Sequence, residues 1–261
     1  MEHSLTVIVC TYNRQKILKS CLESLIKIKE SILTFDIVVI DDGSNYKLKR
    51  DFKDFIVKNN IIYKKNISNK GLAYSRNKGI KAANTKYILI CDDDDAYIKP
   101  NKLKNLYEEV FEKNLDIGIG IPTAQSTFKK GYISDLKNLF LKGITPPVSY
   151  QIYKKSILSK TNYNEKIKAG VDLDLWINLL DKNPNVFLMK YCDIKSIKHK
   201  ANKSLTKNYK KREQDLKYSM NIWENKIVNI LGKEYYLKFK KASKEYELWF
   251  KFLDNISQYR I

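Results

Sequence analysis

A chain of 261 residues is long enough for one substantial domain, with room for an extension at one end. Apolar residues make up 43% of it and aromatic residues 12%, which is typical of a globular core and excludes wholesale disorder. The net charge of +20 indicates either a surface of solvated lysines or attraction to an anionic membrane or a phosphorylated substrate. Zinc-finger, RNP and KH patterns are missing from the sequence, so we expect no nucleic-acid partner.

The sequence carries neither a secretory signal pattern nor an apolar run of about 18 residues that could span a membrane. Its four cysteines are scattered without metal-site spacing and are expected to be reduced thiols. We therefore expect a cytoplasmic protein, with peripheral attachment to the inner face of the cytoplasmic membrane left open.

The N-terminal half alternates short apolar runs with amphipathic segments, a pattern that predicts strands separated by helices. Strands are expected at Leu5–Cys10, Ile37–Ile40, Ile61–Tyr63 and Tyr87–Cys91, and helices at Ile17–Ile28 and Gly71–Ala83. Strands that are apolar throughout are typical of a parallel sheet covered on both faces. The sequence thus predicts an α/β fold, in which ligands bind beyond the carboxyl ends of the strands.

Polar residues follow three of these strands. Thr11, Tyr12, Asn13 and Arg14 follow the first, Asp41 and Asp42 the second, and Asp92 to Asp95 the fourth, while Arg76 lies on the intervening helix. Consecutive aspartates repel one another unless a cation is present. An isolated acidic run is usually a solvated turn or a helix cap, but at the end of a buried strand it favours Mg²⁺ or Mn²⁺ with the phosphates of a substrate.

From about Asp116 the pattern loosens, until Gly170 precedes a helix that begins with Asp172 and Asp174. After His199 the chain is expected to form a long, basic, aromatic-rich helical tail, with 16 Lys and Arg against 7 Asp and Glu over 198–261. The tail aromatics are expected mostly to pack on the domain; contact with an anionic membrane stays open. These aromatics are Trp223, Tyr235, Tyr236, Phe239, Trp249, Phe250 and Phe252.

Five segments together resemble the inverting glycosyltransferase family 2, which has the GT-A fold. They are residues 7–14, 38–44, 69–80, 87–95 and 169–180, in the order of the family's motifs. The resemblance implies a Rossmann-like, mixed but mainly parallel sheet flanked by helices, with a helical C-terminal extension. It divides the chain into a nucleotide-sugar-binding half (1–115), an acceptor-binding half with the catalytic base (116–200) and a basic extension (201–261).

The resemblance also implies a role for each site residue. Thr11, Tyr12 and Asn13 would cup the nucleobase, with the Tyr12 ring stacked on it, and Asp41 and Asp42 would bind base and ribose. Arg76, Asp93 and Asp94 would lie near the diphosphate, and Asp94, Asp95 and His199 would hold Mn²⁺ or Mg²⁺. The register of the metal motif within Asp92 to Asp95 stays open. Asp172 would be the catalytic base, although Val171 replaces the glutamate that precedes it in the family.

The function so implied is a metal-dependent hexosyl- or N-acetylhexosaminyltransferase. It would move a sugar from a nucleoside-diphosphate donor, most commonly a UDP-sugar, to a glycan or lipid-linked acceptor in bacterial surface-polysaccharide synthesis. A sugar nucleotidyltransferase is the first alternative, but it needs a glycine-rich phosphate loop, which residues 10–16 lack. A basic, non-catalytic RNA- or glycan-binding module is the second, and it leaves the ordered motifs unexplained.

Overall fold

The computed structural model describes residues 4–31, 33–98, 100–121, 131–133, 136–141, 148–190, 194–197 and 209–241. Within these ranges the elements are β1 (Leu5–Thr11), α1 (Gln15–Ser31), β2 (Asp36–Asp41), α2 (Arg50–Lys58), β3 (Ile62–Lys65), α3 (Leu72–Ala82), β4 (Tyr87–Asp92), β5 (Asp95–Tyr97), α4 (Pro100–Glu112), β6 (Ile117–Ile121), β7 (Gly131–Ile133), α5 (Leu136–Leu141), the 3₁₀ turn η2 (Val148–Tyr150), β8 (Gln151–Lys154), α6 (Lys155–Thr161), α7 (Val171–Leu179), β9 (Val186–Lys190), β10 (Ile194–Ser196) and α8 (Tyr209–Leu231). A further helix covers 233–241.

In the described part of the chain, eight strands form one sheet in the order β3-β2-β1-β4-β8-β6-β9-β7, and β5 pairs separately with β10. β1 lies parallel to β2 and β4, and β2 lies parallel to β3. β8 runs antiparallel between β4 and β6, whereas β6 and β9 are parallel. The predicted mixed, mainly parallel sheet is confirmed. β6, β8 and β9, which come from the loosely patterned second half, extend the same sheet.

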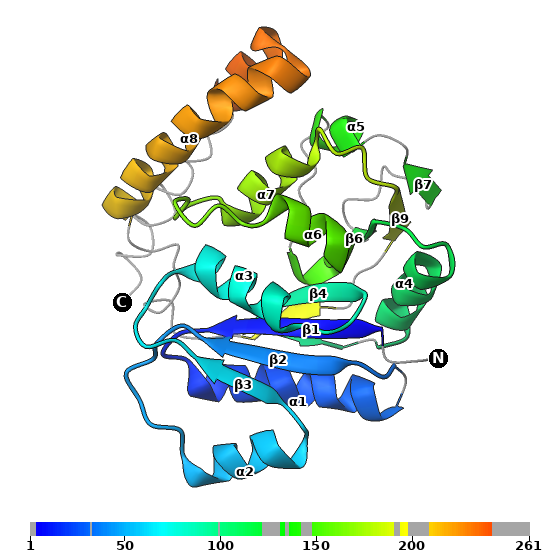
Figure 1. The fold of residues 1–261 in the computed structure, drawn as a ribbon, viewed down its shortest axis with the longest axis vertical. Coiled ribbons are helices and arrows are strands. Elements are labelled where there is room, and N and C mark those ends of the chain that lie inside the picture. Colours follow the sequence, from blue (N-terminus) through cyan, green and yellow to red (C-terminus); the bar gives the residue numbers. More distant parts are fainter. Residues whose placement is uncertain are drawn as a thin grey trace, which may run out of the picture.

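The two faces of the sheet are covered by different helices (Figure 1). Alternation along β1 sends Val7 and Val9 into one core with α1, α2 and α4, and Ile8 and Cys10 into the other with α3, α6, α7 and α8. All seven residues of β1 are buried, which explains why its sequence is apolar almost throughout. The strand order places β1 in the centre, so its carboxyl end can carry a site shared with its neighbours.

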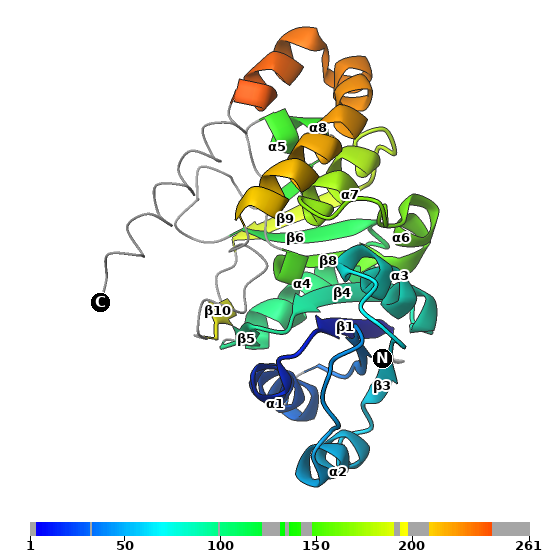
Figure 2. The same ribbon diagram turned by 90° about the vertical axis from the view of Figure 1, so that its left-hand side faces the viewer.

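The C-terminal helix α8 packs across α7 (Figures 1 and 2). Trp223 and Tyr236 are buried, and the Tyr235 hydroxyl donates a hydrogen bond to the Phe140 carbonyl oxygen at 2.9 Å. The Phe239 ring stacks on Phe140 with centroids 6.0 Å apart. The expected packing of tail aromatics therefore holds for these four. Predicted roles for Trp249, Phe250 and Phe252 lie outside the described residues.

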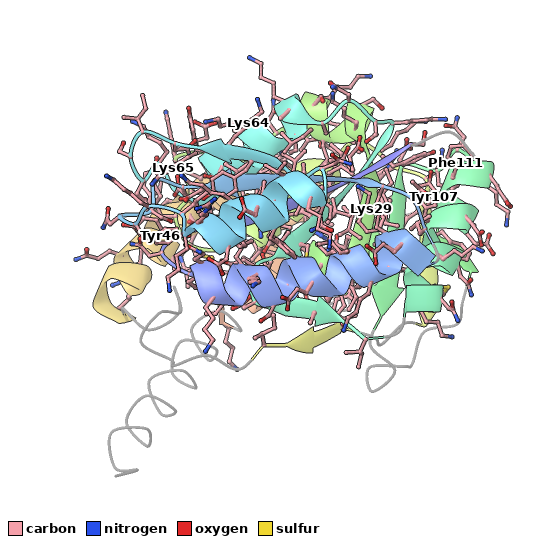
Figure 3. The ribbon with its side chains drawn as sticks, turned by 90° about the horizontal axis from the view of Figure 1, so that it is seen from below. Lys29, Tyr46, Lys64, Lys65, Tyr107 and Phe111 are labelled. Atoms are coloured by element: carbon pink, nitrogen blue, oxygen red, sulfur yellow. The ribbon has the colours of Figure 1, made fainter. Side chains whose placement is uncertain are left out.

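Positive charge on the underside of the domain comes from separate elements (Figure 3). Lys29 lies in the last turn of α1, while Lys64 and Lys65 are exposed on β3 at the sheet edge. Among the described helices none combines the length and apolar character needed to cross a bilayer.

Candidate functional site

The carboxyl ends of β1, β2 and β4 lie side by side. Thr11 is opposite Asp41 across β1 and β2, and Cys10 is opposite Asp92 across β1 and β4. This edge lies at the left of Figure 1 and faces the viewer in Figure 2. The predicted convergence of polar residues from three distant segments is therefore present in the fold.

The loop after β1 is fastened to the loop after β2 through Asn13. Asn13 has a left-handed backbone with φ of 56°, which asparagine tolerates better than most residues. Its N–H donates to Ser44 Oγ at 2.8 Å, and its Oδ1 accepts from the Asn45 N–H at 2.8 Å. The neighbouring Tyr12 side chain is 38% exposed, so it is not a core residue. Its ring is open to a planar partner, as a stacking role requires.

Asp41 and Asp42 are both buried, and their carboxylates bind the protein itself. Asp41 accepts from the Ser44 N–H at 2.7 Å and from the Tyr63 hydroxyl. Asp42 accepts from Asn66 Nδ2 at 2.8 Å and from the backbone N–H groups of 70 and 71 at 2.9 and 2.8 Å. These bonds shape the two loops at the edge. The roles in base and ribose binding predicted for this pair thus compete with contacts already made.

A glycine allows the same two loops to approach each other. Gly43 has φ of 78°, and a Cβ on it would lie 2.4 Å from the carbonyl carbon of Ser68. Any side chain would force the loops apart. The Asp-Gly turn of the sequence is therefore a packing requirement as well as a chain reversal.

The four aspartates from the end of β4 to the start of β5 have different surroundings. Asp93 is buried: its Oδ2 accepts from Thr11 Oγ1 at 2.6 Å, and its Oδ1 lies 2.6 Å from Arg14 Nη2 without hydrogen-bond alignment. Asp94 Oδ2 accepts a hydrogen bond from Arg14 Nη1 at 3.3 Å, and the Asp94 side chain is 26% exposed. Asp92, with 44% of its side chain exposed, accepts from Arg76 Nη2 at 3.0 Å. Thr11 and Arg14 thus hold the cluster from the first loop.

Crowding perturbs the acidity of the cluster. Burial raises the pKa of Asp93 to about 7, although Arg14 and Thr11 counteract the rise. Burial likewise raises the pKa of Asp95 to about 6, with Asp92 and Asp94 adding to it and Ser149 opposing it. Burial is therefore the main reason why these two carboxyl groups hold their protons more strongly than usual. Carboxylate oxygens are the ligands that Mg²⁺ and Mn²⁺ prefer.

No set of three His, Cys, Asp or Glu side chains gathers as a metal site in the part of the chain that is described. Such a set is not required where a nucleotide is bound, because Mg²⁺ usually takes one or two carboxylates and completes its shell with phosphate oxygens and water. The predicted metal ligand His199 lies outside the described residues. The carboxylates of the cluster therefore fit a metal that is shared with a diphosphate.

Arg76 connects the cluster to Asp172. It is 1% exposed, and its Nη1 donates to Asp172 Oδ1 while Nη2 donates to Asp92. Its guanidinium carbon lies 5.2 Å from the centre of the Tyr163 ring, a cation–π contact. Despite its burial, the two aspartates and Tyr163 hold the pKa of Arg76 well above its usual value. This buried cation therefore aligns two carboxylates from distant parts of the sequence.

Asp172 and Asp174 begin α7 but have different environments. The Asp172 side chain is 45% exposed at the edge, whereas Asp174 is buried, accepting from Trp223 Nε1 at 2.8 Å and from Asn178 Nδ2 at 3.0 Å. Burial raises the pKa of Asp174. Asp174 therefore attaches α7 to α8, and Asp172 alone of the two is open to a ligand.

Trp223 also closes over the start of α7. Gly170 has a left-handed φ of 74°, and a Cβ there would lie 2.6 Å from Trp223 Cη2. Ser219, one turn earlier in α8, donates from Oγ to the Ala169 carbonyl oxygen at 2.9 Å. The C-terminal helix therefore fixes the turn that carries Asp172.

Sequence reasoning assigned no role to Ser149 or Tyr163, and it expected Trp223 only to pack on the domain. The Ser149 Oγ accepts the Asp92 N–H at 3.0 Å, a contact that depends on the antiparallel return of the chain beside β4. Tyr163 comes from a segment without a recognisable pattern, whereas the contact of Trp223 with the turn at Gly170 depends on how α8 packs on α7. The sequence placed Arg14 at this edge without a partner, and the structure pairs it with Asp93 and Asp94.

Residues 6–170 match the model of a family described as glycosyl transferase family 2. The chain belongs to this family. The match covers more than half of the sequence and confirms the resemblance seen in the five motifs. A family 2 chain is a glycosyltransferase, so the predicted enzyme class is also confirmed.

Relatives with assigned names agree with the family. MJ1057 of Methanocaldococcus jannaschii, an uncharacterized glycosyltransferase, is 30% identical over 204 residues, covering 71% of this chain and 69% of that protein. Glycosyltransferase GlyG of Streptococcus pneumoniae is 34% identical over 46% of this chain and 39% of its own length. A poly(ribitol-phosphate) beta-glucosyltransferase of Bacillus spizizenii is 27% identical over 64% of this chain, and the match covers only 28% of that enzyme.

Solved structures confirm the GT-A fold. Staphylococcus aureus TarS 1–349 in complex with UDP-GlcNAc superposes with a TM-score of 0.67 at 20% identity, covering 87% of this chain and 67% of that one. The mannosyltransferase PcManGT of Pyrobaculum calidifontis, in complex with GDP-Man and Mn²⁺, gives a TM-score of 0.61 at 14% identity over 89% of this chain and 69% of that one. At these identities the likeness concerns the fold.

Proposed function

We propose that the chain is a metal-dependent, inverting glycosyltransferase that uses a UDP-sugar and transfers a hexosyl or N-acetylhexosaminyl group. Its acceptor would be a hydroxyl of a glycan or lipid-linked oligosaccharide in surface-polysaccharide synthesis on the cytoplasmic side of the membrane. The observation that carries this proposal is the buried Arg76, which joins the acidic cluster to Asp172 across the carboxyl edge of the sheet. Binding of UDP-GlcNAc by TarS, a neighbour in fold, favours the uridine nucleotide.

The nucleotide would bind across the loops after β1 and β2. Tyr12 offers an exposed ring to the base, and Thr11 and Asn13 shape the loop beneath it. We propose that Asp41 and Asp42 act mainly by holding these loops, because their carboxylates already accept five hydrogen bonds from the protein. A contact from either to the base or ribose would use the remaining lone pairs.

Within the cluster, exposure favours Asp92 and Asp94 over Asp93 as metal ligands. Asp94 and Asp92 are partly open, whereas Asp93 is buried against Thr11 and Arg14. Asp93 would then position the first loop, and Asp95 would contribute at the start of β5. When bound, Mn²⁺ or Mg²⁺ would stabilise the negative charge that develops on the departing diphosphate.

Asp172 would act as the general base. In a single displacement the acceptor oxygen bonds to the anomeric carbon, the bond from that carbon to the diphosphate oxygen breaks, and the acceptor proton passes to the Asp172 carboxylate. Arg76 orients this carboxylate, because its Nη1 donates to Asp172 Oδ1. The open side of Asp172 leaves space for the acceptor hydroxyl.

The test combines nucleotide binding with turnover. UDP with Mn²⁺ should raise the melting temperature of the protein, and EDTA should cancel the shift. Asp172→Asn should keep the shift and lower transfer or donor hydrolysis by at least about a hundredfold, the usual range for loss of a general base. Asp181→Asn removes an exposed carboxylate two residues beyond α7 and should change neither.

Two results would contradict the proposal. If UDP, GDP and TDP all fail to raise the melting temperature in the presence of metal, the proposed donor site is contradicted. Full transfer by Asp172→Asn would place the base elsewhere.

A further inference from the structure

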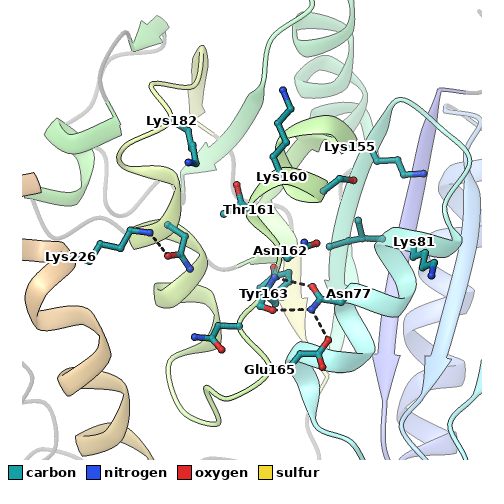
Figure 4. A pocket seen from close by; sticks show the side chains of 14 residues that line it. Asn77, Lys81, Lys155, Lys160, Thr161, Asn162, Tyr163, Glu165, Lys182 and Lys226 are labelled. Atoms are coloured by element: carbon teal, nitrogen blue, oxygen red, sulfur yellow. Dashed lines mark hydrogen bonds between the residues drawn. The ribbon is translucent and has the colours of Figure 1, made fainter.

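A groove with a volume of about 920 Å³ opens on the face of the domain formed by α3, α6, α7 and α8 (Figure 4). Its size matches sites that hold small organic ligands, about 300–1,000 Å³. Its lining residues include none of Asp92 to Asp95, nor Arg76 or Asp172. The groove is therefore separate from the proposed donor site.

The lining is strongly basic. Five lysines contribute to it, from four separate segments of the chain: Lys81, Lys155, Lys160, Lys182 and Lys226. Glu165 is the one acidic lining residue, and its Oε1 accepts from Asn77 Nδ2 at 3.0 Å. A hollow lined by charge of one sign concentrates the electrostatic potential and attracts counter-ions.

Several of these ammonium groups are available to a ligand. Lys81 and Lys160 are exposed, and neither forms an ion pair with a carboxylate among the described residues. Lys155 donates to the Ala83 carbonyl oxygen and Lys226 to Asn178 Oδ1 at 2.6 Å, so both bind neutral acceptors. In Figure 4, Lys182 and Lys226 stand on one side and Lys81 and Lys155 on the other. The positive charge is therefore spread along the groove.

The remaining donors define the ligand more closely. Hydroxyls and amides of Ser159, Thr161, Asn162 and Asn164 also line the groove and can bind neutral hydroxyl groups. The charged donors of the lining are all lysines, whose ammonium groups bind phosphate as point charges. The mixture fits a ligand that carries both phosphate and hydroxyl groups.

The groove touches the catalytic side through one shared wall. Tyr163 lines the groove, and its ring lies against Arg76. The Asn77 side chain clamps the same residue, donating to the Tyr163 carbonyl oxygen and accepting its N–H, both at 2.9 Å. A ligand in the groove would thus be separated by the Tyr163 ring from Arg76, the arginine that orients Asp172.

We propose that this lysine-lined groove is a second binding site, which takes the phosphate groups of a phosphorylated polyol or glycan chain. Its volume accommodates more than one phosphate, with Lys81 and Lys155 toward one side, Lys182 and Lys226 toward the other and Lys160 between them. The site requires neither metal nor nucleotide, because its donors are ammonium, amide and hydroxyl groups.

Calorimetric titration with sodium tripolyphosphate, in EDTA and about 50 mM NaCl, tests the site without the metal-dependent donor site. The double variant Lys81→Gln/Lys160→Gln should weaken binding about tenfold, since two exposed charge contacts are lost. Added salt should weaken the wild-type complex and abolish the difference between the proteins. Lys53→Gln/Lys58→Gln removes the same charge from exposed positions on α2, on the opposite face of the sheet, and should bind like the wild type.

Equal affinities of the two double variants would overturn the proposal, because binding would then reflect net charge alone. Undetectable binding by the wild-type protein would do the same. A single-stranded oligonucleotide that binds the groove more tightly than tripolyphosphate would show that the ligand is a nucleic acid, and the proposed ligand class would be wrong. The UDP–Mn²⁺ thermal shift is measured on every variant. If the UDP–Mn²⁺ shift is retained but tripolyphosphate does not bind, the groove proposal is wrong and the proposed transferase function is unaffected. If tripolyphosphate binds but the UDP–Mn²⁺ shift is missing, only the proposed transferase function is contradicted.

Discussion

Replacement of Gly170 by alanine tests how α8 holds the segment that carries Asp172. The new Cβ would lie 2.6 Å from Trp223 Cη2 and 3.3 Å from Cζ2, well inside normal contact. The indole is 1% exposed and its Nε1 donates to Asp174, so it cannot simply rotate away. Either the turn before α7 or the position of α8 must shift.

The loss of stability expected for Gly170→Ala has two parts. A left-handed backbone at φ of 74° disfavours alanine by about 1 kcal/mol. Overpacking against a buried ring adds about 1–3 kcal/mol. The free energy of unfolding should therefore fall by about 2–4 kcal/mol, read from the midpoint and slope of urea denaturation.

Gly232→Ala provides a matched control. Gly232 also has a left-handed backbone, with φ of 90°, but no atom lies within 4 Å of the position that a Cβ would take there. The loss of stability should be about 1 kcal/mol, from the backbone alone. Trp223→Phe should lower the cost of Gly170→Ala in a double-mutant cycle, because the smaller ring leaves room for the methyl group. Equal losses for the two alanine variants, with no coupling to Trp223, would refute the close packing of α8 on this turn.

Two further predictions concern buried polar groups. Arg76→Lys keeps the charge but cannot donate to Asp172 and Asp92 from two separate nitrogens. Transfer should therefore fall at least about tenfold, and the free energy of unfolding measured in urea should decrease. Unchanged turnover would show that the bridge is dispensable. Burial raises the pKa of Cys10 to about 12, so its thiol should stay protonated at pH 8 and react with iodoacetamide only after unfolding, as peptide mass spectrometry can follow. Rapid alkylation of Cys10 in the native protein would contradict its burial.

The sequence alone predicted the N-terminal half of the fold closely. Apolar runs placed β1, β2, β3 and β4 within one or two residues, and the residues at their ends located the candidate site. This succeeds because a strand buried on both faces must be apolar throughout, and because parallel strands deliver their carboxyl ends to one edge. The second half was harder: β6 contains Gly118 and Gly120, and η2, β8 and α6 follow one another directly, so neither strand nor helix periodicity develops.

The partners of the site residues were decided only by the tertiary structure. Asp41, Asp42 and Asp93 come from strong motifs, yet the folded chain surrounds them with hydrogen bonds and leaves Asp94 and Asp172 more open. The sequence determines which carboxylates reach the edge, because strand position is encoded locally. It does not determine which of them stay available to a ligand, since that depends on side chains such as Arg76 and Trp223, brought in by packing over long separations along the chain.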